Sequence, residues 1–146
     1  MDAWLAGAIG GLLGTVALSV LMMPALRDEP PLPSLLLARL SGGDADGQAL
    51  RMAGMAGHFV YGAFAGLLFG AVVGGLVGAA ILLWVLGLLF GALLLLFAIV
   101  GWGPPLDLRA RLEGLSVAER HARIVGLSAG HLAYGLVLGL TVSVLA

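Results

Sequence analysis

The chain has 146 residues, of which 61% are hydrophobic and 10% are charged, and its mean hydropathy is +1.12. Soluble domains are about 45–50% apolar and about 25% charged, so this composition excludes an ordinary soluble domain and indicates a small integral membrane protein. The net charge of −1 gives no electrostatic basis for nucleic-acid binding, and the absence of cysteine excludes disulfides, thiolate metal ligands and cysteine nucleophiles.

Three long uncharged runs lie at 3–26, 52–106 and 124–146, and the second is long enough for two spans, since a span takes about 20 mostly apolar residues. We predict spans at about 3–25, 53–73, 77–101 and 122–145, with a glycine turn at Val73-Gly74-Gly75-Leu76 between the second and the third. Ser34 is predicted to cap a short helix over residues 35–40 on the membrane surface. The sequence Ser116-Val117-Ala118-Glu119 matches a capping box, so the last helix is predicted to start near Val117 and to run for about 30 residues.

The charged residues lie almost entirely in the two loops that follow the first and the third predicted spans. These residues are Arg27, Asp28, Glu29, Arg39, Asp44, Asp46 and Arg51 in one loop, and Asp107, Arg109, Arg111, Glu113, Glu119, Arg120 and Arg123 in the other. All seven basic residues of the chain are arginines in these loops, and the positive-inside rule therefore predicts that both loops are cytoplasmic and both termini outside. Asp2 stands where a secretory signal carries positive charge, so we expect no cleaved signal peptide.

The two halves of the chain resemble each other. Residues 56–67 read AGHFVYGAFAGL and residues 129–140 read AGHLAYGLVLGL, and an upstream block recurs as PPLPSLLLARL at 30–40 and PPLDLRARL at 104–112. We interpret this as a duplication, with one repeat over about 1–73 and the other over about 74–146. Because each repeat contains two spans, the repeats are predicted to enter the membrane in the same orientation.

Small residues four apart form stripes on every predicted span, and such stripes let helix backbones approach closely in lipid. The stripes of spans two and four contain both histidines of the repeated motif, and the glycines with a predicted helix-packing role are Gly54, Gly62, Gly66, Gly70, Gly135 and Gly139. Span one has Gly7, Gly11, Thr15 and Ser19, and span three has Gly87 and Gly91. From these stripes we expect spans two and four to be in close contact.

His58 and His131, with Tyr61 and Tyr134 three residues later, are the candidate ligand or proton-relay residues. The simplest interpretation is packing, in which a neutral histidine donates to a backbone carbonyl of a neighbouring helix. One alternative is haem b bound by both histidines, with Gly62 and Gly135 making room for the ring. Another is a proton or solute pathway. No Cys, Asp or Glu lies beside the histidines to complete a tetrahedral divalent site, so we expect no metal site and, outside the haem alternative, no cofactor.

The motifs His58-Phe59-Val60-Tyr61-Gly62 and His131-Leu132-Ala133-Tyr134-Gly135, with a glycine-rich first span ending at Met-Pro, resemble a family of small four-span prokaryotic membrane proteins that has no established activity. The resemblance implies an all-α four-helix transmembrane bundle in a prokaryotic cytoplasmic membrane. We expect a non-enzymatic accessory or structural component. Its expected partners are the lipid bilayer and a larger membrane complex or further copies of the chain, and not nucleic acid.

Overall fold

The computed structural model describes residues 1–23, 30–45, 47–76 and 79–146, and every regular element in them is helical. The elements are α1 (Ala3–Met22), α2 (Leu32–Ser41), α3 (Gln48–Phe69) with a π-helical end η2 (Gly70–Gly74), α4 (Ala80–Phe97) with a π-helical end η3 (Ala98–Trp102), α5 (Leu108–Glu113) and α6 (Val117–Leu145).

Among the described residues, four helices are long and apolar enough to cross a membrane: Ala3–Met22, Gln48–Gly74, Ala80–Trp102 and Val117–Leu145. They match the four predicted spans. The predicted turn at Val73–Leu76 overlaps the end of η2, and there the amide of Leu76 donates to the carbonyl of Val73. Residues 24–25 and 77–78, at the edges of two predicted spans, lie outside the described residues, as do Arg27, Asp28, Glu29 and Asp46.

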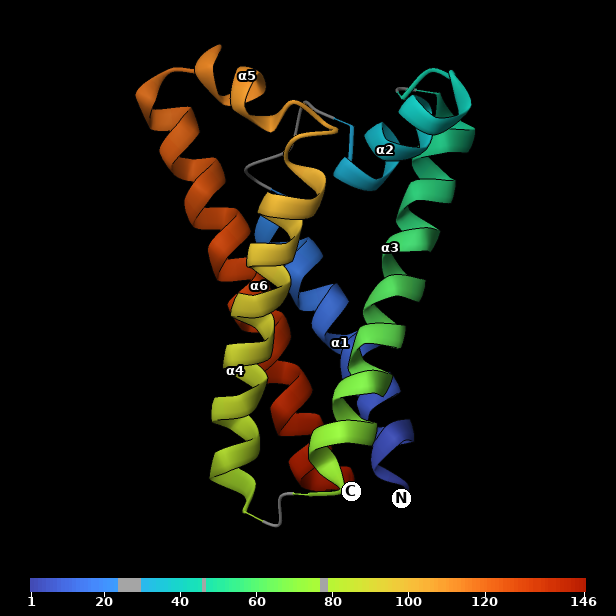
Figure 1. The fold of residues 1–146 in the computed structure, drawn as a ribbon, viewed down its shortest axis with the longest axis vertical. Helices are drawn as coiled ribbons and strands as arrows, with labels where there is room; N and C mark the ends of the chain where they lie inside the picture. Colours follow the sequence, from blue (N-terminus) through green and yellow to red (C-terminus); the bar gives the residue numbers. More distant parts are fainter. Residues whose placement is uncertain (24–29, 46, 77–78) are drawn as a thin grey trace.

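The long helices lie in the spatial order α3, α1, α6, α4, because the principal contacts are those of α1 with α3, α1 with α6, and α4 with α6 (Figure 1). Both termini lie at one end of the molecule, with the turn from η2 to α4, and the short helices α2 and α5 lie at the opposite end. All charged residues of the described part except Asp2 lie at or towards the α2–α5 end.

Glycines of α1 and α3 interlock along an antiparallel contact. A Cβ atom on Gly11 would meet the carbonyl of Gly62 and the Cα of Gly66, and one on Gly7 would meet Gly66 and Gly70. The hydroxyl of Thr15 bonds to the carbonyl of Gly11 at 2.7 Å and fills the space beside Gly62. The two helix backbones are therefore in direct contact, which is how helices gain van der Waals energy in lipid.

An equivalent contact joins α4 to α6. A Cβ atom on Gly87 would meet Gly135 and Gly139, and one on Gly91 would meet the carbonyl of His131 and Gly135. The glycine stripes of α3 and α6 thus pack against α1 and α4. The expectation that these stripes bring α3 and α6 into close contact is wrong, because each stripe faces the other long helix of its own half.

A further face of α1 joins the two halves. Gly14 packs against the ring of Tyr134, Gly10 against Leu138, and Gly130 of α6 against Leu18 and Met22. The buried core of the bundle gathers around this contact and contains Ala6, Leu18, Phe69, Leu83, Tyr134, Leu138 and Val142. Glycine on two faces of α1 allows this helix to lie between two neighbours.

The short helix α2 differs from its prediction. It begins at Leu32, after Pro31, and Ser34 makes no capping bond. Ser34 is instead fully buried, with its backbone and Oγ against Gly54 of α3. Two prolines at 30 and 31 favour this earlier start, because proline fits the entry to a helix, where its missing N–H costs nothing. Gly54 therefore packs against α2 and not against a long helix.

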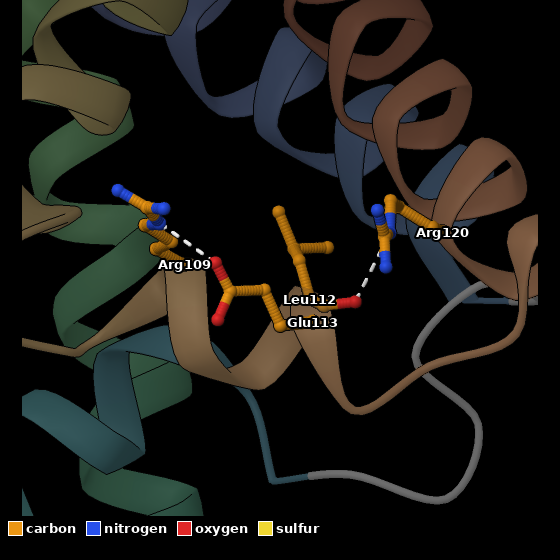
Figure 2. Close-up of polar contacts among 4 residues, drawn as sticks. All are labelled: Arg109, Leu112, Glu113 and Arg120. Atoms are coloured by element: carbon orange, nitrogen blue, oxygen red, sulfur yellow. Dashed lines mark hydrogen bonds and ion pairs between the residues drawn. The ribbon is translucent and has the colours of Figure 1, made fainter.

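The capping box at the start of α6 is confirmed. The Ser116 Oγ accepts from the Glu119 amide at 3.3 Å, and the Glu119 carboxylate accepts from the Ser116 amide at 2.9 Å. At the same corner Arg120 donates to the carbonyl of Leu112, while Arg109 pairs with Glu113 within α5 (Figure 2). Helix α6 runs from Val117 to Leu145, a length of 29 residues, as the capping box predicts.

We expect Ser116→Ala to destabilise the start of α6 by about 1 kcal/mol, the usual effect of losing a serine N-cap. Hydrogen exchange of the amides of the first turn of α6 in detergent measures this directly. Ser41→Ala is the matched control, since the Ser41 hydroxyl donates to the Leu37 carbonyl and accepts from the Gly43 amide, and neither group belongs to α6. Equal exchange in the wild type and the S116A variant would contradict the role of the cap.

Candidate functional site

The repeated motifs place their polar side chains on α3 and α6. His58 and Tyr61 lie on α3, and His131 and Tyr134 lie on α6. The two helices run in the same direction, since each starts at the α2–α5 end (Figure 1). The Tyr134 hydroxyl donates to the carbonyl of Gly62 at 2.7 Å. This bond fixes the level at which the two motifs meet.

The histidines lie about one turn from this bond, towards the α2–α5 end. His58 precedes Gly62 by four residues and His131 precedes Tyr134 by three, so each histidine shares a helix face with the residue that makes the bond. The two histidines therefore lie at a similar level in the bundle, one on α3 and one on α6.

His131 has a defined tautomer. Its Nδ1 lies 2.9 Å from the carbonyl oxygen of Leu127, and a carbonyl can only accept, so Nδ1 carries the proton. The Nε2 atom of the neutral ring therefore keeps its lone pair. The expected donation to a neighbouring helix is wrong for this side chain, because the acceptor lies one turn earlier in the same helix.

The two halves of the site are not equivalent. Tyr134 is 2% exposed and bonds to α3, whereas Tyr61 is 43% exposed and makes no hydrogen bond to another described residue. His58 is half-buried, and its ring meets the edge of Phe59 with the centroids 6.2 Å apart. The asymmetry arises because α1 packs closely against α6, whereas α4 has only a slight contact with the end of α3.

The glycines of the motifs leave no room for a flat ring at their own positions. Thr15 and the Gly11 carbonyl fill the space beside Gly62, and the Gly87 carbonyl fills that beside Gly135. The specific expectation that these two glycines make room for haem is therefore wrong. The groups of the site that can hold a ligand are the free Nε2 of His131 and the imidazole of His58.

The sequence patterns did not predict three polar features of the bundle. The Ser19 Oγ and the Ser34 Oγ are buried, and neither has a hydrogen-bond partner among the described residues. The Trp84 indole donates to Ser143 at 2.9 Å and joins α4 to α6. Ser143, at the end of the stripe that contains His131, was the only sequence signal for this bond. The sequence of one helix does not show which side chain of another helix lies opposite it.

Four membrane-length helices with apolar exposed faces, held together by glycine contacts, define a polytopic helical membrane protein as the class. Within the described ranges, no group of three or more His, Cys, Asp or Glu side chains is placed to hold a metal ion. No family model, no curated protein and no solved structure matches the chain.

Proposed function

We propose that the chain is a non-enzymatic, multi-pass component of a prokaryotic cytoplasmic membrane, acting as an accessory or structural subunit. The observation that carries this proposal is that the polar side chains named here, inside the spans, form hydrogen bonds that hold the helices together. Tyr134, Thr15 and the Trp84–Ser143 pair all bond helices or helix backbone, and none forms a nucleophile–base pair. The resemblance to the four-span family agrees with this role and stays a prediction.

The outer faces support association with lipid and with other membrane proteins. Large apolar side chains are exposed along α3 and α4, including Val60, Phe64, Leu68, Leu89 and Leu93. Helix α4 is the most apolar of the four and buries the smallest share of its surface. The exposed apolar face of such a helix is covered by lipid or by another helix. The proposed partners are therefore the bilayer and a larger membrane complex or further copies of the chain.

Isolation in a mild detergent, followed by native mass spectrometry, tests the accessory role. We expect the chain to be recovered with another membrane protein or as a homo-oligomer. A lone monomer under conditions that preserve known membrane complexes of the same cells would contradict it.

The proposed topology has cytoplasmic arginine loops and both termini outside, because the arginines of the described residues are at or near the α2–α5 end. A reporter fused after Ala146 is expected to be active outside the cytoplasm. The same reporter inserted after Gly114, between α5 and α6, is expected to be active inside. A cytoplasmic signal from the fusion after Ala146 would overturn the orientation.

We also propose that the two halves arose by duplication and lie as parallel repeats. The contacts support this, since Gly11 meets Gly62 and Gly66 in one half, and Gly87 meets Gly135 and Gly139 in the other. Gly62 and Gly135 hold the same place in the two motifs, as do Gly66 and Gly139. The same glycine contact is thus built twice from equivalent positions.

The alternative function is a haem b-binding or proton-conducting protein that uses the histidine pair. The free Nε2 of His131 favours it, because haem iron is bound by such an atom. An absorption spectrum of protein from haem-supplied cells separates this alternative from the accessory role. A Soret band that is lost in His58→Ala and His131→Ala would support haem, and a colourless protein would exclude it.

A further inference from the structure

Gly57 of α3 is a glycine in open space. A Cβ atom at this position would meet no neighbouring heavy atom within 4 Å, and the residue is exposed. The other glycines of α1, α3 and α4 each lie against a neighbouring helix: Gly7, Gly10, Gly11, Gly14, Gly54, Gly62, Gly66, Gly87 and Gly91. Glycine weakens the interior of a helix, and in a membrane a close contact between backbones compensates for this loss. Gly57 therefore has the residue type of a helix contact, on a face that no described helix covers.

The equivalent position in the second half of the chain is a helix contact. Gly57 and Tyr61 correspond to Gly130 and Tyr134 in the repeated motif. On α6, Gly130 packs against side chains of α1, and the ring of Tyr134 packs on Gly14 of α1. The glycine–tyrosine face of this motif is thus able to receive a helix, and in one half of the molecule it does so.

The corresponding face of α3 is turned away from the rest of the bundle. Helix α3 lies at one edge of the row α3, α1, α6, α4, and its Gly62 packs against α1 (Figure 1). Gly57 precedes Gly62 by five residues, which places it about 140° around the helix from this contact. Tyr61 is 43% exposed, and its hydroxyl bonds to no other described residue. The exposed residues on this side form what we call the outer face of α3: Ala53, Gly57, Tyr61, Phe64 and Leu68.

The outer face of α3 is complementary to itself. The contact of α6 with α1 pairs a tyrosine ring, that of Tyr134, with a glycine, Gly14. The outer face of α3 carries both residue types, and a helical side chain lies over the turn that precedes its own Cα, so the Tyr61 ring lies at the level of Gly57. Two copies in one membrane have the same orientation. A two-fold axis along the membrane normal therefore places the Tyr61 ring of each copy opposite Gly57 of the other.

Two further features favour pairing between two α3 helices. The exposed residues of α4, at the other edge of the row, include no glycine, so head-to-tail pairing of α3 with α4 of another copy lacks the glycine partner for Tyr61. Ala53 precedes Gly57 by four residues, which is the spacing of small residues at which membrane helices approach closely.

We propose that two copies of the chain form a two-fold dimer through the outer faces of their α3 helices, with the Tyr61 ring of each copy packed on Gly57 of the other. The Tyr61 hydroxyl then donates to a backbone carbonyl of the other copy beside Gly57, as the Tyr134 hydroxyl donates to the Gly62 carbonyl. This dimer gives a surface to the association with further copies of the chain in the proposed function, and it rests on that function.

A single introduced cysteine tests this dimer, because the chain contains no cysteine of its own. Ala53→Cys leaves Gly57 and Tyr61 intact, and a disulfide forms only where two Cα atoms come within about 7 Å of each other. We expect A53C to give a disulfide-linked dimer when membranes that contain the full chain are oxidised with copper phenanthroline. Val85→Cys, on the exposed face of α4, is the matched control and is expected to stay monomeric.

Gly57→Leu in the A53C background separates specific pairing from random collision. The leucine fits the single chain, where position 57 is open, but it fills the space that the Tyr61 ring of the other copy takes. We expect dimerisation to weaken at least about 10-fold, measured as the yield of linked dimer at low protein density in lipid. Ala56→Leu is the control, since Ala56 is exposed about 100° around the helix from Gly57 and A56L should keep the yield. Circular dichroism checks that both variants are folded.

Three results would overturn the dimer through α3: no crosslink in A53C, a yield that G57L leaves unchanged, or crosslinking of V85C as efficient as that of A53C. Native mass spectrometry distinguishes this failure from failure of the accessory role. A homo-oligomer without the A53C crosslink removes only this surface, whereas a lone monomer contradicts both. Excess detergent separates the copies, so unfolding in detergent reports the stability of the single chain and not this contact.

Discussion

Gly62→Leu is expected to lower the free energy of unfolding by about 3 kcal/mol or more, the upper range for forcing a larger side chain into a packed interior. A Cβ atom at this position would overlap the Thr15 hydroxyl and lie close to the Gly11 carbonyl of α1. Thr15 is fully buried and its hydroxyl bonds to the Gly11 carbonyl, so this side chain cannot turn away without losing that bond. The remaining atoms of the leucine then force α1 and α3 apart. Thermal unfolding in detergent, followed by circular dichroism, measures the effect.

Gly57→Leu on the same helix is the matched control. A Cβ atom at Gly57 would meet nothing within 4 Å, so the leucine is accommodated at the surface. We expect G57L to be as stable as the wild type, or more stable by up to about 1 kcal/mol, because leucine is a better helix former than glycine. Equal melting temperatures for G62L and G57L would show that α1 and α3 do not pack through their glycines.

Ala65 is not a suitable control for this experiment, although the four-residue spacing of the stripe leaves it off the small face. Ala65 is only 5% exposed in the bundle. The spacing identifies the face on which backbones touch, but a helix packed by two neighbours buries a wider surface than one stripe. The difference between G62L and A65L therefore reports the degree of packing, and not a contrast between protein and lipid.

The spans, the turn after η2 and the start of α6 could be predicted because each depends on local chemistry. Hydropathy over about 20 residues defines a span, paired glycines favour a turn, and Ser116 with Glu119 satisfies the first amides of a helix. The start of α2 could not be predicted in the same way. Burial of Ser34 against Gly54 is a tertiary contact, and it competes successfully with the capping role that the residue has in isolation.

The sequence proposes members for the candidate site, but it does not predict how they are arranged. Duplicated motifs single out His58 and His131, but equivalent sequences do not imply equivalent surroundings. Helix α1 covers Tyr134 through Gly14, whereas Tyr61 on the other motif is 43% exposed. A stripe of small residues likewise shows which face of a helix packs closely, but not which helix packs against it. The sequence therefore predicts contact between α3 and α6, whereas their stripes contact α1 and α4.

Tyr134→Ala is expected to cost about 3 kcal/mol or more, the usual effect of removing a large buried aromatic side chain. The ring is 2% exposed and packs on Gly14 of α1, and its hydroxyl bonds to the Gly62 carbonyl of α3, so one side chain connects α6 to two other helices. Tyr134→Phe keeps the ring and removes only the hydroxyl. The expected loss is about 0.6–1.7 kcal/mol, the range for hydrogen bonds between helices in a membrane.

Tyr61 provides the comparison that separates the two motifs. If they are inequivalent, Tyr61→Phe leaves the unfolding free energy unchanged, because no described residue bonds to its hydroxyl, and Tyr61→Ala costs clearly less than Tyr134→Ala. Unfolding of all four variants in one detergent, at the same protein-to-detergent ratio, gives the two differences directly. Equal losses of unfolding free energy at the two tyrosines would mean that the two motifs have equivalent surroundings, with α4 covering Tyr61 as α1 covers Tyr134. That result would contradict the spatial order α3, α1, α6, α4.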